Sequence, residues 1–98
     1  MANPEAIIAD DEAQLRVYLK SKLSGLWPEL IISGEAGNGL EALELIDTCR
    51  PAIAFLDIKM PGLSGLEVAQ KISADCRVVF ITAYDQFAVE AFESEAID

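Results

Sequence analysis

The sequence predicts one α/β domain in which a parallel β-sheet carries helices on both of its faces. Short apolar runs of strand length alternate four times with longer amphipathic segments of helical period. Three of these runs, AIIA, AIAFL and VVFIT, are almost continuously apolar, as strands buried on both faces of a parallel sheet must be. A chain of 98 residues can hold one hydrophobic core of this kind but hardly two.

The first two strand–helix units occupy the N-terminal half of the chain, with their strands and helices expected in the order Ala6–Ala9, Glu12–Leu23, Leu30–Ser33 and Gly39–Cys49. In the first helix, Leu15, Tyr18 and Leu19 recur at helical spacing and should form its buried face. The second helix has a defined start, because Asn38 is followed three residues later by Glu41, which is the spacing of a capping box.

The last two units follow at Ala52–Leu56, Gly65–Ser73, Val78–Thr82 and Gln86–Ser94. Pro61 and Gly62 stand between the third strand and its helix, where they favour a turn. Ser64 with Glu67 repeats the capping-box spacing and predicts where the third helix begins. The predicted elements therefore form a regular βα series without a linker or a low-complexity segment.

Composition excludes several classes of function. Seven basic residues against seventeen acidic ones give a net charge of −10, the wrong sign for binding nucleic acid by this piece. The chain has no histidine, which excludes Ser-His-Asp and Cys-His catalysis. Cys49 and Cys76 lie far apart, in no metal-binding spacing, and are expected to be reduced. With no signal peptide and no apolar run near the roughly 20 residues of a membrane span, we expect a cytoplasmic protein that does not bind a membrane.

Three acids stand where predicted strands end. Asp10 and Asp11 follow the first strand, and Asp57 follows the third. In a parallel sheet of order 2-1-3-4 these two strands are neighbours, and their carboxyl ends lie at the edge where ligands bind. Two carboxylates about 5 Å apart repel by roughly 3 kcal/mol at an effective dielectric constant of about 20. A divalent cation would offset this repulsion, and Mg²⁺ prefers such oxygen ligands.

A carboxylate beside Mg²⁺ can accept a phosphoryl group without a general base, because it is already ionised. Thr82 closes the fourth strand on the same edge, where its hydroxyl could donate to a bound anion, and the small Ala83 follows it. A simpler alternative remains for each residue. Asp11 could cap the first helix, and Asp57 could cap a turn. Thr82 could be an ordinary strand residue, since β-branched residues are common in strands.

The acidic pair Asp10-Asp11, the segment FLDIKMPGLSG and the segment VFITAYDQFAVEAF occur together in the order and spacing of response regulator receiver domains. The chain resembles this family over essentially its whole length, and is similar in particular to receivers with a LytTR-type (LytR/AlgR) DNA-binding output domain. The resemblance implies a flavodoxin-like fold, an Mg²⁺ cofactor and a sensor histidine kinase as partner. Residues 1–98 would form the receiver domain, and the output domain would be absent.

The resemblance also implies roles for single residues. Asp57 would be the phosphoryl acceptor. Asp11 and Asp57 would bind Mg²⁺ together with the backbone carbonyl of Lys59, while Asp10 would act mainly through a metal-bound water. The resemblance implies no catalytic residue in the sense of an enzyme, since self-phosphorylation and autodephosphorylation would be the only chemistry.

For the fourth strand, the resemblance makes Thr82 the switch hydroxyl that moves toward the phosphoryl group, with Ala83 kept small to leave access. Receivers continue into a fifth strand and a fifth helix, whereas this sequence stops at Asp98. The lysine that contacts the phosphoryl oxygens in the family is therefore absent, as is the aromatic switch residue. We expect a truncated receiver that can form a homodimer through its exposed fourth strand or its uncovered helix-packing surface.

Three alternative functions make different demands on the sequence. A Mg²⁺-dependent phosphohydrolase of the haloacid dehalogenase kind would need a second aspartate two residues after the first, where Lys59 stands. A flavin or nucleotide module would need a Gly- or Ser/Thr-rich loop after the first strand, where two acids stand. A third alternative is an interaction or dimerisation module that is never phosphorylated.

Overall fold

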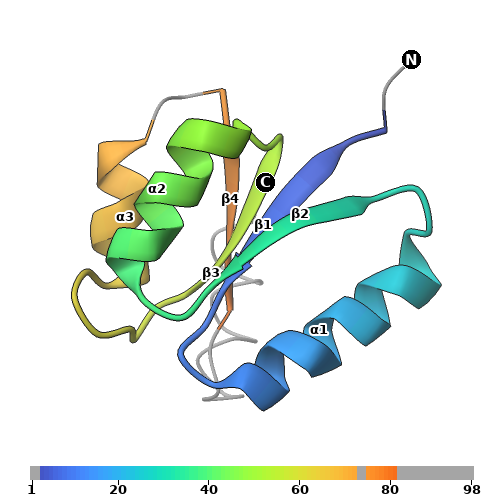
Figure 1. Ribbon diagram of the computed structural model, residues 1–98, viewed down its shortest axis with the longest axis horizontal. Helices are drawn as coiled ribbons and strands as arrows, with labels where there is room; N and C mark the ends of the chain where they lie inside the picture. Colours follow the sequence, from blue (N-terminus) through green and yellow to red (C-terminus); the bar gives the residue numbers. More distant parts are fainter. Residues whose placement is uncertain (1–2, 73–74, 82–98) are drawn as a thin grey trace, which may run out of the picture.

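The computed structural model describes residues 3–72 and 75–81, which form a parallel sheet between two helical layers. Helix α1 covers one face of the sheet, and helices α2 and α3 lie side by side on the other (Figure 1). The elements are β1 Glu5–Ala9, α1 Ala13–Leu26, β2 Ile31–Ala36, α2 Gly39–Cys49, β3 Ile53–Asp57, α3 Gly65–Lys71 and β4 Arg77–Ile81. The helix predicted at Gln86–Ser94 lies outside the described residues.

The strand order in the sheet is β2-β1-β3-β4, which confirms the predicted flavodoxin-like order 2-1-3-4. All three pairings are parallel, and β1 pairs with both β2 and β3. Ala9 at the end of β1 lies opposite Leu56, and Asp57 at the end of β3 lies opposite Ile81. The carboxyl ends of β1, β3 and β4 therefore lie in line at one edge of the sheet.

Strand β1 divides its side chains between two cores, because successive residues of a strand point to opposite faces. Ala6 and Ile8 pack on the α1 side with Phe55, and Ile7 and Ala9 pack on the side of α2 and α3. These four residues of β1 are fully buried, and Glu5 at its start is exposed. This two-sided burial explains why the predicted strand showed no polar alternation.

The helix starts agree with the predicted caps. The Asn38 side chain accepts a hydrogen bond from the amide of Glu41, and Ser64 and Glu67 form a complete capping box. Helix α1 begins differently, since the side chain of its N-cap residue, Glu12, makes no cap hydrogen bond. The start of α1 therefore lacks the side-chain cap that α2 and α3 have.

Three predictions for the first half of the chain were wrong in detail. Helix α1 runs to Leu26, three residues beyond the predicted end, and ends where Trp27 donates to the carbonyl of Leu23 ahead of Pro28. Tyr18 does not lie on the buried face, because its side chain is 61% exposed. Strand β2 runs on to Ala36, beyond the predicted Ser33, because its pairing with β1 continues to that residue.

None of the three described helices combines the length and the apolar character needed to cross a membrane. Cys49 and Cys76 are both free thiols, as expected from their spacing.

Candidate functional site

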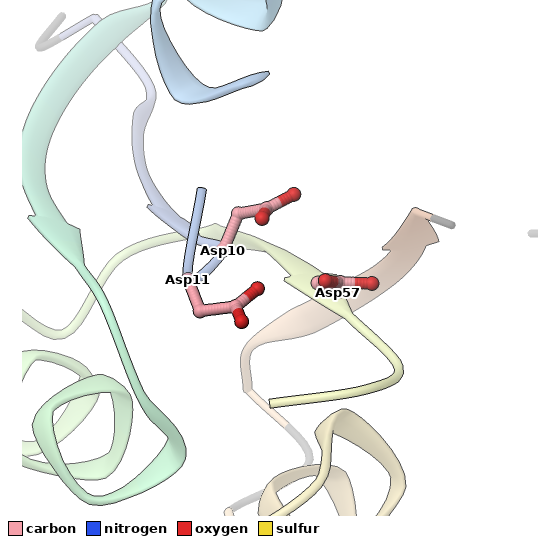
Figure 2. A group of neighbouring side chains, drawn as sticks. All are labelled: Asp10, Asp11 and Asp57. Carbon is pink, nitrogen blue, oxygen red and sulfur yellow. The ribbon is translucent and has the colours of Figure 1, made fainter. Parts of the chain in front are cut away.

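Asp10, Asp11 and Asp57 converge at the carboxyl edge of the sheet. One carboxylate oxygen from each residue can be chosen so that all three lie within 4.8 Å of one another. Figure 2 shows Asp10 and Asp11 leaving the turn after β1 and Asp57 leaving the end of β3, with their side chains extending in the same general direction. The described part of the chain has no other such group of potential metal ligands.

Asp10 is the buried member of the three, with only 4% of its surface exposed. Its amide donates to the carbonyl of Ala36 at the end of β2 (3.0 Å), and its carboxylate Oδ1 accepts from the amide of Glu12 (2.9 Å). Asp10 therefore holds the turn that leads into α1, and α1 itself has no side-chain cap. Burial raises the pKa of Asp10, and the charges of Asp11 and Glu12 raise it further.

Asp57 is the last residue of β3 and is half-buried. Burial raises its pKa from the ordinary value of 3.8 to about 6, and the nearby charges of Asp10 and Asp11 add to this effect. Backbone hydrogen bonds from Lys59 and Ile58 act in the opposite direction and keep the pKa from rising further. At neutral pH the carboxylate is thus mostly ionised, in a place where its charge is poorly compensated.

The loop after Asp57 is held tightly against both neighbouring helices. The amide of Gly65 donates to the carbonyl of Ile58 (2.9 Å), and the amide of Gly39 donates to the carbonyl of Pro61 (3.2 Å). A Cβ atom on Gly65 would lie 2.3 Å from the carbonyl oxygen of Asp57, so only glycine fits there. Gly62 has a φ of +80°, a left-handed conformation that glycine adopts without strain. These contacts fix the backbone on which Asp57 is presented.

Residues 6–98 match the sequence profile of the response regulator receiver domain. The chain belongs to this family. A response regulatory protein of Vibrio cholerae serotype O1, itself uncharacterized, is 49% identical over 96 residues, which are 95% of this chain and 37% of that protein. The positive alginate biosynthesis regulatory protein of Pseudomonas aeruginosa is 44% identical over 94 residues, or 93% of this chain and 38% of that protein.

The receiver domain thus spans about two fifths of the length of these curated relatives. The match to the alginate regulator agrees with the expected closeness to LytR/AlgR-type regulators. Among solved structures, the signal receiver domain of NarL from Mycobacterium tuberculosis superposes with a TM-score of 0.79 and 34% identity, covering 87% of this chain and 70% of that one. The fold and the family therefore agree with each other.

The simpler alternatives for the acids hold only in part. The N-cap of α1 is Glu12 rather than Asp11, so Asp11 does not cap the first helix. Asp57 does accept backbone hydrogen bonds from the turn that follows it, which agrees with the alternative that Asp57 caps a turn. That role does not account for two further carboxylates placed within reach of it.

The donor set of this receiver domain fits Mg²⁺. Three carboxylates from two neighbouring strands supply hard oxygen ligands, and their mutual repulsion and partial burial disfavour three negative charges without a cation. Lys59 lies exposed in the loop two residues after Asp57. The predicted role of its carbonyl stays a prediction, and Thr82 and Ala83 lie outside the described residues.

Reasoning from the sequence missed Arg16, which reaches the site from α1. Its guanidinium donates to the carbonyl of Asp10 and pairs with Glu35 on β2. No sequence motif indicates this contact, because it depends on how α1 lies across the ends of β1 and β2.

Proposed function

We propose that this receiver domain is a signalling switch that accepts a phosphoryl group on Asp57 from a sensor histidine kinase. The observation that carries the proposal is the convergence of Asp10, Asp11 and Asp57 within 4.8 Å at the carboxyl edge of the sheet. This is the edge at which ligands bind in parallel α/β sheets. The family membership of the chain supports the same function.

Asp11 and Asp57, with the carbonyl of Lys59, would hold Mg²⁺ directly, and Asp10 would hold it mainly through water. When bound, the ion offsets negative charge on the acids and on the phosphoryl oxygens. The raised pKa of Asp57, about 6, supports this assignment, since a cation would relieve the repulsion that contributes to it. The backbone amides of Ile58 and Lys59 orient the Asp57 carboxylate.

In the transfer, a lone pair on a carboxylate oxygen of Asp57 forms the O–P bond while the N–P bond of the donor phosphohistidine breaks. The electron pair of that bond stays on the imidazole nitrogen, which takes up a proton from solvent. No residue of this chain has to act as a base, because Asp57 is mostly ionised at neutral pH. Thr82 would then donate its hydroxyl to the phosphoryl group, and Ala83 would leave room for it.

Intact-mass measurement after incubation with acetyl phosphate and Mg²⁺ tests the proposal. The wild type should gain the mass of one phosphoryl group, and Asp57→Ala should gain none. Asp47→Asn, which removes an exposed acid from α2, serves as the matched control and should gain it as the wild type does. An unchanged wild-type mass would instead favour the interaction or dimerisation module. A gain that persists in Asp57→Ala would place the acceptor elsewhere.

The wider setting is also part of the proposal. We expect the protein to be cytoplasmic, to act as a switch rather than an enzyme, and to control a DNA-binding output domain in the whole regulator. The relative named as a positive alginate biosynthesis regulatory protein supports a regulatory output. Pairing of two copies through β4 or through a helix surface remains a prediction. Light scattering that shows only monomers at high concentration would contradict it.

A further inference from the structure

The side chain of Arg16 joins three parts of the fold next to the acidic site. Its Nη1 donates to the carbonyl oxygen of Asp10 (2.5 Å), and its Nε donates to Oε1 of Glu35 (3.1 Å). The same Nη1 lies 3.8 Å from the position that a Cβ of Gly37 would occupy, just beyond the end of β2. The side chain of Arg16 is mostly buried, with 20% of it exposed.

The carbonyl that Arg16 contacts belongs to the peptide group between Asp10 and Asp11. A peptide group is planar, so a hydrogen bond to its oxygen restricts rotation on both sides, at ψ of Asp10 and φ of Asp11. The amide of Asp10 is already held by Ala36 and its carboxylate by Glu12. The bond from Arg16 therefore constrains the part of this turn that sets the direction of the exposed Asp11 side chain.

Arg16 is itself held in place from the β2 side. Glu35 accepts from Arg16 through Oε1 and from Lys20 through Oε2 (2.5 Å). Hydrogen bonds from both cations lower the pKa of Glu35, so this carboxylate remains ionised at neutral pH. A planar guanidinium can serve two acceptors in fixed directions from Nη1 and Nε, whereas a lysine ammonium has no such fork.

We infer that Arg16 is a positioning residue for the metal site, which holds the Asp10–Asp11 peptide group so that the Asp11 carboxylate faces Asp57. The inference rests on the proposed function, since it assigns Arg16 a role in Mg²⁺ binding. Arg16 would contact neither the ion nor the phosphoryl group and would act through the backbone alone. Partners that orient metal ligands in this way typically change metal affinity by 10–100-fold when they are removed.

Electrostatics and positioning predict opposite effects of removing Arg16. A guanidinium repels a nearby divalent cation, so losing its charge alone would tighten Mg²⁺ binding. Losing its hold on the Asp10 carbonyl would weaken Mg²⁺ binding, because Asp11 would no longer be oriented before the ion arrives. The direction of the change therefore identifies the role.

Isothermal titration of the protein with Mg²⁺ makes this comparison. We expect Arg16→Ala to raise the Kd by about tenfold or more. Arg16→Lys should also raise it severalfold, because lysine keeps the charge and loses the fork. Lys22→Ala removes a cation from the same helix without touching Asp10 or Glu35, and it should leave the Kd within twofold. Thermal unfolding tests whether each variant is folded. If Arg16→Ala does not fold, the Kd of Arg16→Lys for Mg²⁺ tests the inference.

A Kd that falls or stays unchanged in the Arg16 variants, while the wild type binds Mg²⁺, would overturn this inference alone. Lower thermal stability with an unchanged Kd would mean that Arg16 only stabilises the contact between α1 and β2. A wild-type protein that binds no Mg²⁺ would overturn the proposed function and this inference together.

Discussion

Gly65 at the start of α3 lies against the backbone of Asp57, so closely that an added Cβ would sit 2.3 Å from the Asp57 carbonyl oxygen. The contact is between two backbones, so no flexible side chain can move aside to relieve it. The proposed phosphoryl acceptor and the first residue of the helix beside it are thus fixed relative to each other.

Replacing Gly65 by alanine should therefore displace the end of β3 or the start of α3. We expect the free energy of unfolding to fall by about 1–3 kcal/mol, the usual cost of overpacking. Gly25→Ala is the matched control, because nothing lies within 4 Å of a Cβ at that helical position. It should stabilise the protein by up to about 1 kcal/mol. Urea unfolding of both variants measures the difference, and equal stabilities would contradict the close contact.

Stability should depend on pH through Asp57 when no divalent cation is present. The pKa of Asp57 is about 6 in the folded protein and near 3.8 in the unfolded chain, so the folded state binds more protons between these values. The free energy of unfolding, as far as it depends on Asp57, is therefore highest below pH 4 and falls as the pH rises toward 7.

Asp57→Asn removes this effect and should be more stable than the wild type at pH 7.5 in EDTA. Because the side chain is partly exposed and screened by solvent, we expect a gain of about 1–2 kcal/mol, and none at pH 3.5. Urea unfolding at both pH values measures it. An advantage that is equal at the two pH values would show that ionisation of Asp57 is not its cause.

Mg²⁺ should stabilise the folded protein by mass action, since the three acids come together only in the fold. At a concentration about 100 times Kd the gain is about 2.7 kcal/mol. Asp57→Asn should lose most of this gain, and Asp47→Asn should keep it, because Asp47 is an exposed acid outside the site. Thermal unfolding with and without Mg²⁺ gives the result. Equal shifts in the two variants would mean that the ion binds somewhere other than at Asp57.

Leu56 precedes Asp57, the proposed acceptor, and is fully buried against α2 and α3. Leu56→Ala should lower the free energy of unfolding by about 2–5 kcal/mol, because it removes buried apolar surface and leaves a cavity. Leu26→Ala makes the same chemical change at a side chain that is 82% exposed, and should cost less than about 0.5 kcal/mol. Similar losses at the two positions would contradict the assigned core.

Much of this architecture could be predicted because parallel strands impose strong rules. Unbroken apolar runs such as AIAFL indicated buried strands, and acids placed directly after two of them had to meet at one edge. The location of Asp10, Asp11 and Asp57 at one edge follows from those rules, whereas the strand order was predicted from the resemblance to receiver domains.

Details that depend on side-chain reach could not be predicted in the same way. Tyr18 fits the helical period of α1, yet it is exposed. Periodicity alone does not show how much of the surface of α1 the sheet covers. Strand β2 contains Ser33 and Gly34, which weaken its pattern, and pairing with β1 carries it on to Ala36. The contact between Arg16 and Asp10 required knowledge of where α1 crosses the strand ends.

The pairing of β1 with β3 has a consequence for how the protein is made. Asp10 and Asp11 are synthesised early, and Asp57 follows only after β2 and α2 have been translated. Asp57 then joins them when the chain between β1 and β3 brings these two strands together. A nascent chain that has reached only α2 therefore has no complete acidic cluster. The proposed binding of Mg²⁺ would arise only when β3 enters the sheet beside β1, so it would report that these two central strands have paired.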